Sequence, residues 1–194
     1  MARTRIPVRS TPAPQTNYRL YKTDLRTDFE RQCGYCSTPD YILGGRSVYH
    51  IDHFAPHSRF PTLKLVYGNL VYACAYCNRS KSNKWIGTIA TVSHDDTQGF
   101  VDPCSPDFDL HIDRDQAGRF VSRTAVGSYM IENLRLDLLR HQHVWQCLKL
   151  TELRERLRSI KEKVGDVRDR LELLEAIDVL TQAYERFREQ IVEG

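Results

Sequence analysis

The last part of the chain carries the clearest helical pattern of apolar residues. Two series recur at alternating spacings of three and four residues: Leu150, Leu153, Leu157, Ile160 and Val164, and then Leu173, Ile177, Leu180, Tyr184, Phe187 and Ile191. Each spacing places its members on one face of a helix. Gly165-Asp166 separates the two series, and a glycine followed by a potential N-cap is typical of a helix break. The pattern favours an antiparallel hairpin over residues 137–192, with one continuous helix as the alternative.

Nearer the amino terminus, short apolar runs alternate with turns. Residues 47–51 and 70–73 are rich in β-branched and aromatic residues, which predicts two strands. Pro56 and Pro61 lie between them and disfavour regular structure. A helix is expected from residue 75 to about 84, so that a strand, a loop, a second strand and a helix follow one another.

Two further elements flank this unit. A short helix is predicted around residues 21–31. Residues 107–112 and 119–122 could pair as a hairpin around Gln116-Ala117-Gly118.

These patterns divide the 194 residues into four segments. We expect a flexible amino-terminal arm at 1–17, a core at 18–90, an acidic, turn-rich segment at 91–127 and a helical arm at 128–194. No apolar run approaches the ~18 residues of a membrane span, and the first residues lack the apolar core of a secretory signal. With 41% hydrophobic and 27% charged residues, the composition is that of an ordinary globular protein. The expected location is the cytoplasm, where thiols stay reduced.

Four of the six cysteines form two C-x-x-C pairs, Cys33 with Cys36 and Cys74 with Cys77. In a reducing compartment such pairs favour a metal over disulfides. Four thiolates in tetrahedral geometry suit Zn²⁺ and leave no open coordination position. We therefore predict a structural zinc site that pins the loop before the first strand to the start of the helix. Four independent core or redox cysteines are the alternative.

The net charge is only +3, but the charge is unevenly distributed. Residues 44–90 hold six lysines and arginines against one acidic residue, Asp52. Arg79, Lys81 and Lys84 lie at and after the start of the expected helix, where they could bind phosphates. DNA is the predicted polyanionic partner. Chance clustering of charge on a solvated face is the alternative.

Three residues of this region could hydrolyse a phosphodiester, a reaction that needs an activated water and a cation on the phosphate oxygens. His53 is the best general base, because the pKa of histidine lies near neutrality. Asp52 and Asn78 offer oxygen ligands that suit Mg²⁺ or Mn²⁺. In a regular strand Asp52 and His53 would point to opposite faces, so both reach one site only if the strand ends or bends there. His50, which shares a strand face with Asp52, is the alternative base.

Residues 28–86 resemble the HNH endonuclease family. The matching features are C-x-x-C at 33–36, Ile51-Asp52-His53 followed by Pro56, Gly68-Asn69-Leu70, Cys74-x-x-Cys77-Asn78, and Lys81. Many members carry histidine where this chain has Asn78, and the pattern here resembles an H-N-N variant. The resemblance implies an α+β fold, with a small zinc-stapled ββα-metal core followed by a C-terminal α-helical extension. It also implies that His53 is the base in preference to His50, and that Asn69 braces the loop between the strands through backbone hydrogen bonds.

The sequence thus predicts a metal-dependent endonuclease with structural Zn²⁺ and catalytic Mg²⁺ or Mn²⁺. Beyond the core, Phe100-Val101-Asp102-Pro103, His111, Gly118 and Gly127 resemble the extension of HNH proteins encoded beside an ATPase in bacterial antiphage systems of the Septu and retron type. That resemblance implies an ATPase partner, with the helical arm binding this partner or a second copy of the chain.

Three alternatives remain open. The protein could be a stand-alone restriction or mobile-element HNH nuclease, a zinc-stapled nucleic-acid-binding module without cleavage, or a zinc-built protein-interaction domain. Asp52, His53 and Asn78 together distinguish the nucleases from the other two, because only a nuclease needs this set.

Overall fold

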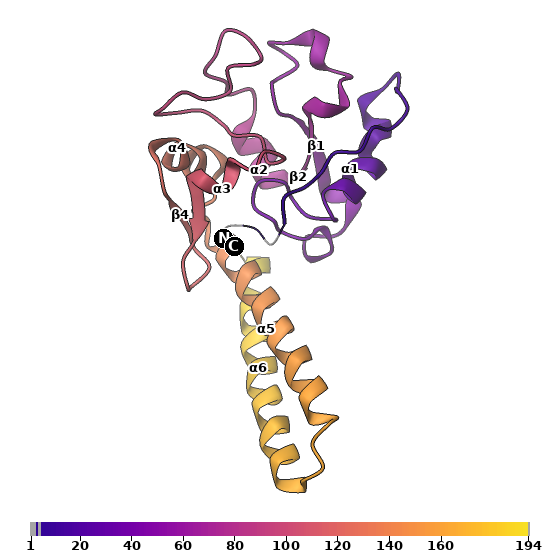
Figure 1. Ribbon diagram of the computed structural model, residues 1–194, viewed down its shortest axis with the longest axis vertical. Helices are drawn as coiled ribbons and strands as arrows, with labels where there is room; N and C mark the ends of the chain where they lie inside the picture. The colour runs from indigo at the N-terminus through magenta and orange to yellow at the C-terminus, as the bar shows by residue number, and fades with distance from the viewer. Residues whose placement is uncertain (1–2, 4, 194) are drawn as a thin grey trace. The chain divides into compact units, whose positions relative to one another are not determined.

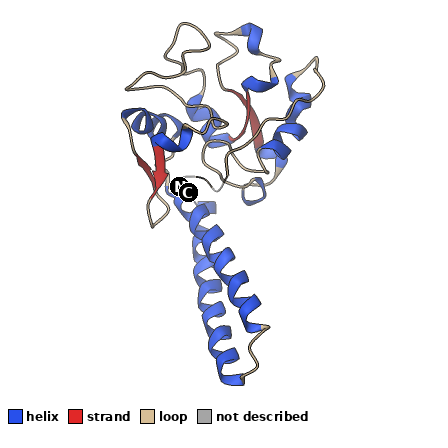
Figure 2. Cartoon of the chain, in the orientation of Figure 1, coloured by secondary structure: helices blue, strands red, loops and turns tan. Residues whose placement is uncertain are grey.

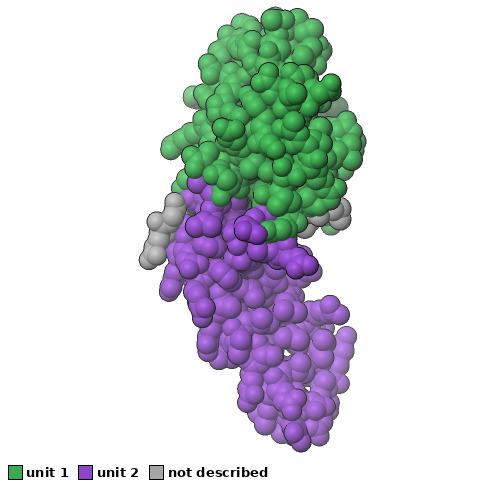
Figure 3. All heavy atoms as spheres, turned by 90° about the vertical axis from the view of Figure 1, so that its left-hand side faces the viewer, with its two compact units in different colours: residues 1–115, 120–137 green, residues 116–119, 138–194 purple. Residues whose placement is uncertain are grey.

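The computed structural model describes residue 3 and residues 5–193 (Figure 1). Its contacts divide the chain into two compact units (Figure 3). Unit 1 comprises residues 1–115 and 120–137, and unit 2 comprises residues 116–119 and 138–194. The mixed α+β class expected from the sequence is confirmed. In the described part of the chain, unit 1 holds two small sheets among short helices, and unit 2 holds a pair of long helices (Figure 2).

The centre of unit 1 is the predicted succession of strand, loop, strand and helix. β1 (Tyr49–His53) pairs antiparallel with β2 (Leu70–Cys74), and every residue of β2 is buried. α2 (Ala75–Lys81) follows β2 without a linker. The Cys74 sulfur caps α2 by accepting a hydrogen bond from the amide of Cys77 at 3.5 Å. The end of β2 and the first turn of α2 are therefore joined directly.

Short helices surround this motif. A 3-10 helix (Tyr18–Tyr21) runs into α1 (Lys22–Asp28), whose Leu25 is fully buried. Further single-turn 3-10 helices lie at Asp40–Ile42, Arg46–Val48, Pro61–Leu63 and Tyr67–Asn69. The last two belong to the connection between β1 and β2, where the prolines predict no longer element.

The segment after α2 adds a second layer to unit 1. It contains α3 (Phe108–His111), β3 (Ile112–Arg114), β4 (Phe120–Ser122) and α4 (Ala125–Leu134). β3 and β4 pair as the predicted hairpin. The strand predicted at 107–112 is wrong as far as residue 111, where a helical turn buries Phe108 completely. Gly127 lets α4 lie against the end of α3, because a Cβ there would sit 1.9 Å from the His111 carbonyl oxygen.

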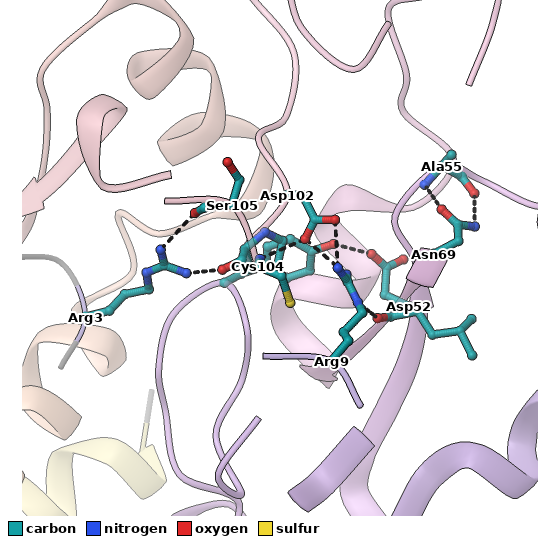
Figure 4. Close-up of polar contacts among 11 residues, drawn as sticks. Arg3, Arg9, Asp52, Ala55, Asn69, Asp102, Cys104 and Ser105 are labelled. Carbon is teal, nitrogen blue, oxygen red and sulfur yellow. Dashed lines mark hydrogen bonds and ion pairs between the residues drawn. The ribbon is translucent and has the colours of Figure 1, made fainter. Parts of the chain in front are cut away.

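Arginine side chains tie the amino-terminal segment to unit 1 (Figure 4). The Arg9 guanidinium donates to both carboxylate oxygens of Asp102, at 2.9 and 3.0 Å, and to the Leu70 carbonyl at 2.9 Å. Arg3 pairs with Asp109 at 3.0 Å. Residues 5–15 form no helix or strand, as expected of an extended arm. The predicted flexibility does not extend to Arg3 and Arg9, because bidentate arginine–carboxylate pairs fix geometry. Residues 1, 2 and 4 of the predicted arm lie outside the described residues.

Unit 2 is built on α5 (Leu139–Lys161) and α6 (Val167–Glu193), which pack along each other. Two pairs of contacts give their direction: His143 with Phe187, and Cys147 with Tyr184. Early residues of α5 therefore meet late residues of α6. The antiparallel hairpin is confirmed, and the continuous helix is excluded.

The two ends of this hairpin differ in part from expectation. Asp166 caps α6 as predicted, accepting hydrogen bonds from the amides of Arg168 and Asp169 at 2.8 and 3.1 Å. The other end begins at Leu139, close to the expected residue 137. The helical arm expected at 128–194 is divided, because α4 packs on β4 and α2 in unit 1. Among the described residues, no helix has the length and apolarity needed to cross a membrane.

Candidate active site and metal centre

Four sulfur atoms form a closed cluster at the base of the ββα motif. Cys33 and Cys36 come from the turn after α1, Cys74 ends β2 and Cys77 lies in the first turn of α2. All four side chains are buried, and their sulfur atoms lie within 4.8 Å of one another. The Cys36 and Cys74 sulfurs are 3.8 Å apart. That is the edge, about 3.8 Å, of a tetrahedron with metal–sulfur distances of about 2.3 Å.

The surroundings of this cluster fit a cationic metal. Burial raises the pKa of the Cys33 thiol well above its usual range, so a bound cation would have to displace the proton. The half-buried Arg114 side chain donates to the Cys36 carbonyl at 3.0 Å, which places positive charge beside the sulfurs and would offset the negative charge of four metal-bound thiolates. Burial lowers the pKa of Arg114 to about 10, against the opposing effect of Cys36 and Cys77. The four cysteines could therefore bind zinc in a closed, all-sulfur site.

Gly34 has a packing role in this turn. Its amide donates to the Tyr72 carbonyl at 2.8 Å. A Cβ would lie 2.7 Å from the Phe29 ring and 2.8 Å from a methyl group of Val71. Glycine therefore lets the first C-x-x-C turn lie flat against the sheet.

The His53 side chain is buried, and one of its ring nitrogens is held by a backbone carbonyl. Its Nε2 lies 3.0 Å from the Lys64 carbonyl oxygen. Because a carbonyl oxygen only accepts, Nε2 carries the proton and Nδ1 is left as an acceptor. The ring packs against Tyr18 at 4.7 Å and His57 at 4.4 Å between centroids. Burial lowers the pKa of His53, which keeps the imidazole neutral near pH 7, the state required of a general base.

Asn69 makes the backbone hydrogen bonds expected of it (Figure 4). Its side-chain oxygen accepts from the Ala55 amide at 2.8 Å, and its side-chain nitrogen donates to the Ala55 carbonyl at 2.9 Å. The side chain is buried, so these bonds form in a medium where an unpaired amide would be costly. They fix the chain two residues after His53.

Asp52 occupies the opposite face of β1 from His53. Lys81 of α2 is fully buried and lies 3.0 Å from the Asp52 carboxylate and 3.0 Å from the His53 carbonyl oxygen. The Tyr35 hydroxyl donates to the same carboxylate. Burial raises the pKa of Asp52, while Lys81 and Tyr35 counter part of that rise. β1 does not end before His53, so the alternation of a regular strand separates the two side chains.

Lys81 does not lie where the sequence analysis expects it. Its ammonium group is enclosed by the Asp52 carboxylate and by the rings of Phe54 and Phe100, at 6.0 and 5.7 Å from their centroids. A fully enclosed ammonium has no access to a DNA phosphate, so the predicted phosphate contact is replaced by an interior ion pair. Arg79 and Lys84 are exposed, and their contact with phosphates stays a prediction.

Asp52 and Asn78, the expected ligands of a catalytic divalent ion, have separate partners. The Asp52 carboxylate is occupied by Lys81 and Tyr35, and the Asn78 amide nitrogen lies 3.0 Å from His50 Nδ1. Burial, together with the charges of Arg79 and Lys22, lowers the pKa of His50. As placed, these side chains do not fit a shared divalent ion, because Lys81 holds the position that a cation would take beside Asp52.

Residues 33–84 match the model of the HNH endonuclease family. The chain therefore carries an HNH domain, which includes the four cysteines, both strands and α2. Searches of curated proteins and of solved structures give no significant match. An HNH domain supports a nuclease, and the zinc-compatible cluster agrees with the zinc-stapled core expected from the sequence. Residues 1–32 and 85–194 lie outside the matched HNH domain.

Sequence reasoning missed three contributors to this region. Tyr35 stands inside the first C-x-x-C turn, the Lys64 carbonyl belongs to the loop between β1 and β2, and Arg114 comes from β3. Tyr35 could have been suspected from its place between two metal ligands. A backbone carbonyl and an arginine outside the motif give no such signal.

Cys74→Ser should release zinc and destabilise the fold, because it opens the closed site. Structural zinc contributes several kcal/mol, and 1 kcal/mol corresponds to about 2–4 °C in a chain of this size, so a drop of about 10 °C in Tm is expected. Metal analysis and thermal unfolding measure both effects. Cys104→Ser, outside the cluster, is the matched control and should keep the metal. Equal zinc content in the two variants would contradict the assignment of Cys74 to the zinc site.

Lys81→Ala should lower the free energy of unfolding by about 3–5 kcal/mol, because it leaves the buried Asp52 carboxylate without its counter-charge. Lys84→Ala, at an exposed position close by, should change it by less than about 0.5 kcal/mol. Urea unfolding of both variants provides the comparison. If Lys81→Ala kept its stability and lost affinity for DNA instead, the interior pair would be the wrong description.

Proposed function

We propose that the protein is an HNH endonuclease that hydrolyses phosphodiester bonds of DNA. The observation that carries this proposal is His53, a neutral imidazole within the HNH domain whose Nε2 is fixed by the Lys64 carbonyl. In that arrangement Nδ1 would take the proton of an attacking water. Asn69 supports the role by fixing the backbone at Ala55. Arg79 and Lys84 would bind the flanking phosphates.

The proposal includes a divalent cation, Mg²⁺ or Mn²⁺, in addition to structural zinc. Such an ion would neutralise charge on the phosphate. Asp52 and Asn78 are the oxygen donors that the sequence offers, and Asp52 could serve only after exchanging Lys81 for the ion. The requirement is tested by titrating Mg²⁺ or Mn²⁺ into zinc-loaded protein and measuring DNA cleavage.

His53→Ala should reduce cleavage of plasmid DNA at least about 100-fold, the usual contribution of a general base. Zinc content should stay unchanged, because His53 does not touch the cysteine cluster. His94→Ala is the matched control, since this histidine lies outside the HNH domain. His50→Ala tests the rival base. An undiminished rate in His53→Ala together with an inactive His50→Ala would transfer the role to His50.

We further propose that the α5–α6 hairpin binds a protein, either a second copy of this chain or an ATPase subunit of an antiphage defence system of the Septu or retron type. The observation that supports this proposal is the exposure of apolar side chains on the two helices. Leu153, Leu171 and Leu174 are 43%, 55% and 45% exposed, whereas Ile177 and Ile191 of α6 are buried. Charged residues of both signs surround them, as in helices whose partners are chosen by charge pairing.

Replacing Leu171 and Leu174 by glutamate should disrupt this association while Tm stays within about 2 °C, because both side chains are exposed and such surface changes are worth less than about 0.5 kcal/mol. Light scattering of the purified protein tests self-association. Copurification with the product of a neighbouring ATPase gene tests the other partner. Gln190→Glu is the matched control on α6. The docking role fails if the double variant forms the same complexes as wild type.

A further inference from the structure

A basic depression lies beside His53 in unit 1. It is lined by residues 16–19, His57, Lys64 and Leu65, and its volume is about 420 Å³. That volume falls within the range of about 300–1,000 Å³ typical of ligand sites. The lining contains two basic side chains, Arg19 and Lys64, and no aspartate or glutamate.

The depression is connected to His53 through two contacts. Tyr18 and His57, both in its lining, pack directly on the His53 ring. The backbone carbonyl of Lys64 holds His53 Nε2, so the Lys64 side chain is anchored at a residue in direct contact with His53. A group bound in the depression would therefore lie next to the imidazole.

The cationic groups of the depression are free to bind an anion. Arg19 and Lys64 are exposed, and within the described residues neither forms an ion pair with a carboxylate. The segment that carries Arg19 is fixed locally, because the Asn17 side chain accepts a hydrogen bond from the Arg19 amide at 3.0 Å. Two basic side chains without acidic partners, in the lining of one depression, are suited to a phosphate group.

We propose that this depression binds a backbone phosphate of the DNA substrate, adjacent to the bond that is cut, through Arg19 and Lys64, with His57 in the same lining. The inference rests on the proposed nuclease function. Arg19 lies outside the HNH domain at 33–84, so the segment before α1 adds a wall to the site that the matched domain does not contain. Arg19 and Lys64 act as positioning residues, which hold the strand against His53.

Binding is measured by fluorescence anisotropy with zinc-loaded, full-length protein, a labelled DNA duplex and no added Mg²⁺ or Mn²⁺. Each phosphate contact contributes about 0.9 to the slope of log affinity against log salt. Arg19→Ala and Lys64→Ala should each lower that slope by about 0.9 and weaken binding about eightfold at 0.1 M salt. Arg19→Lys should keep most of the affinity. Arg156→Ala, an exposed arginine of α5, is the matched control and should match wild type.

Cleavage with Mg²⁺ or Mn²⁺ separates this inference from the proposed function. In active protein, Arg19→Ala and Lys64→Ala should raise KM with a smaller effect on kcat, and Tm should stay at the wild-type value. If wild type cleaves DNA but both variants bind it as Arg156→Ala does, the phosphate site is overturned and the nuclease stands. If wild type fails to cleave while both variants lose affinity and salt slope, the nuclease is overturned and the phosphate site stands.

Discussion

The convergence of four buried sulfur atoms is the constraint on which the core of this protein depends. A two-stranded sheet is marginal by itself in water. Here α2 follows β2 directly, and the turn after α1 packs against the sheet. The four cysteines bring this turn, the end of β2 and the start of α2 together at one point. If these four thiols were deprotonated, the thiolates would repel one another strongly at this distance unless a cation lay between them. Zinc held by these four cysteines would therefore couple metal binding to folding of the core.

A second polar group in the interior gives β1 two different faces. The Asp52–Lys81 pair joins β1 to α2 on one face, and Tyr35 adds a hydroxyl from the first cysteine turn. The strand alternates, so the neighbouring His53 is directed to the other face, toward Lys64 and His57. Of these two adjacent residues, one thus joins an interior ion pair and the other is the histidine proposed as the base. A buried pair of this kind contributes little net stability but is costly to break, which makes it suited to fixing orientation.

The sequence predicts those features whose physical cause is local. The C-x-x-C spacing and the three-four apolar spacing each follow from the geometry of one turn or one helix, and both the cysteine cluster and the hairpin are confirmed. The helical turn at 108–111 depends on burial of Phe108 against distant elements, and no local signal gives it. Arg9 finds Asp102 across more than ninety residues, which a linear pattern does not show.

Lys81 is the instructive intermediate case. A lysine near the end of a short helix looks solvent-exposed, and the sequence analysis treats it so. Yet Lys81 follows Cys77 by four residues, and residues at that spacing share a helix face. Once Cys77 is assigned to the buried cluster, the same helix geometry directs Lys81 inward, where it requires a buried carboxylate such as Asp52. Arg79 lies two residues from Cys77 and is directed to the opposite side, toward solvent. The metal assignment therefore contains information about the neighbouring charges: it divides the basic residues of the HNH domain into one that holds the core together and others that remain available to a phosphate.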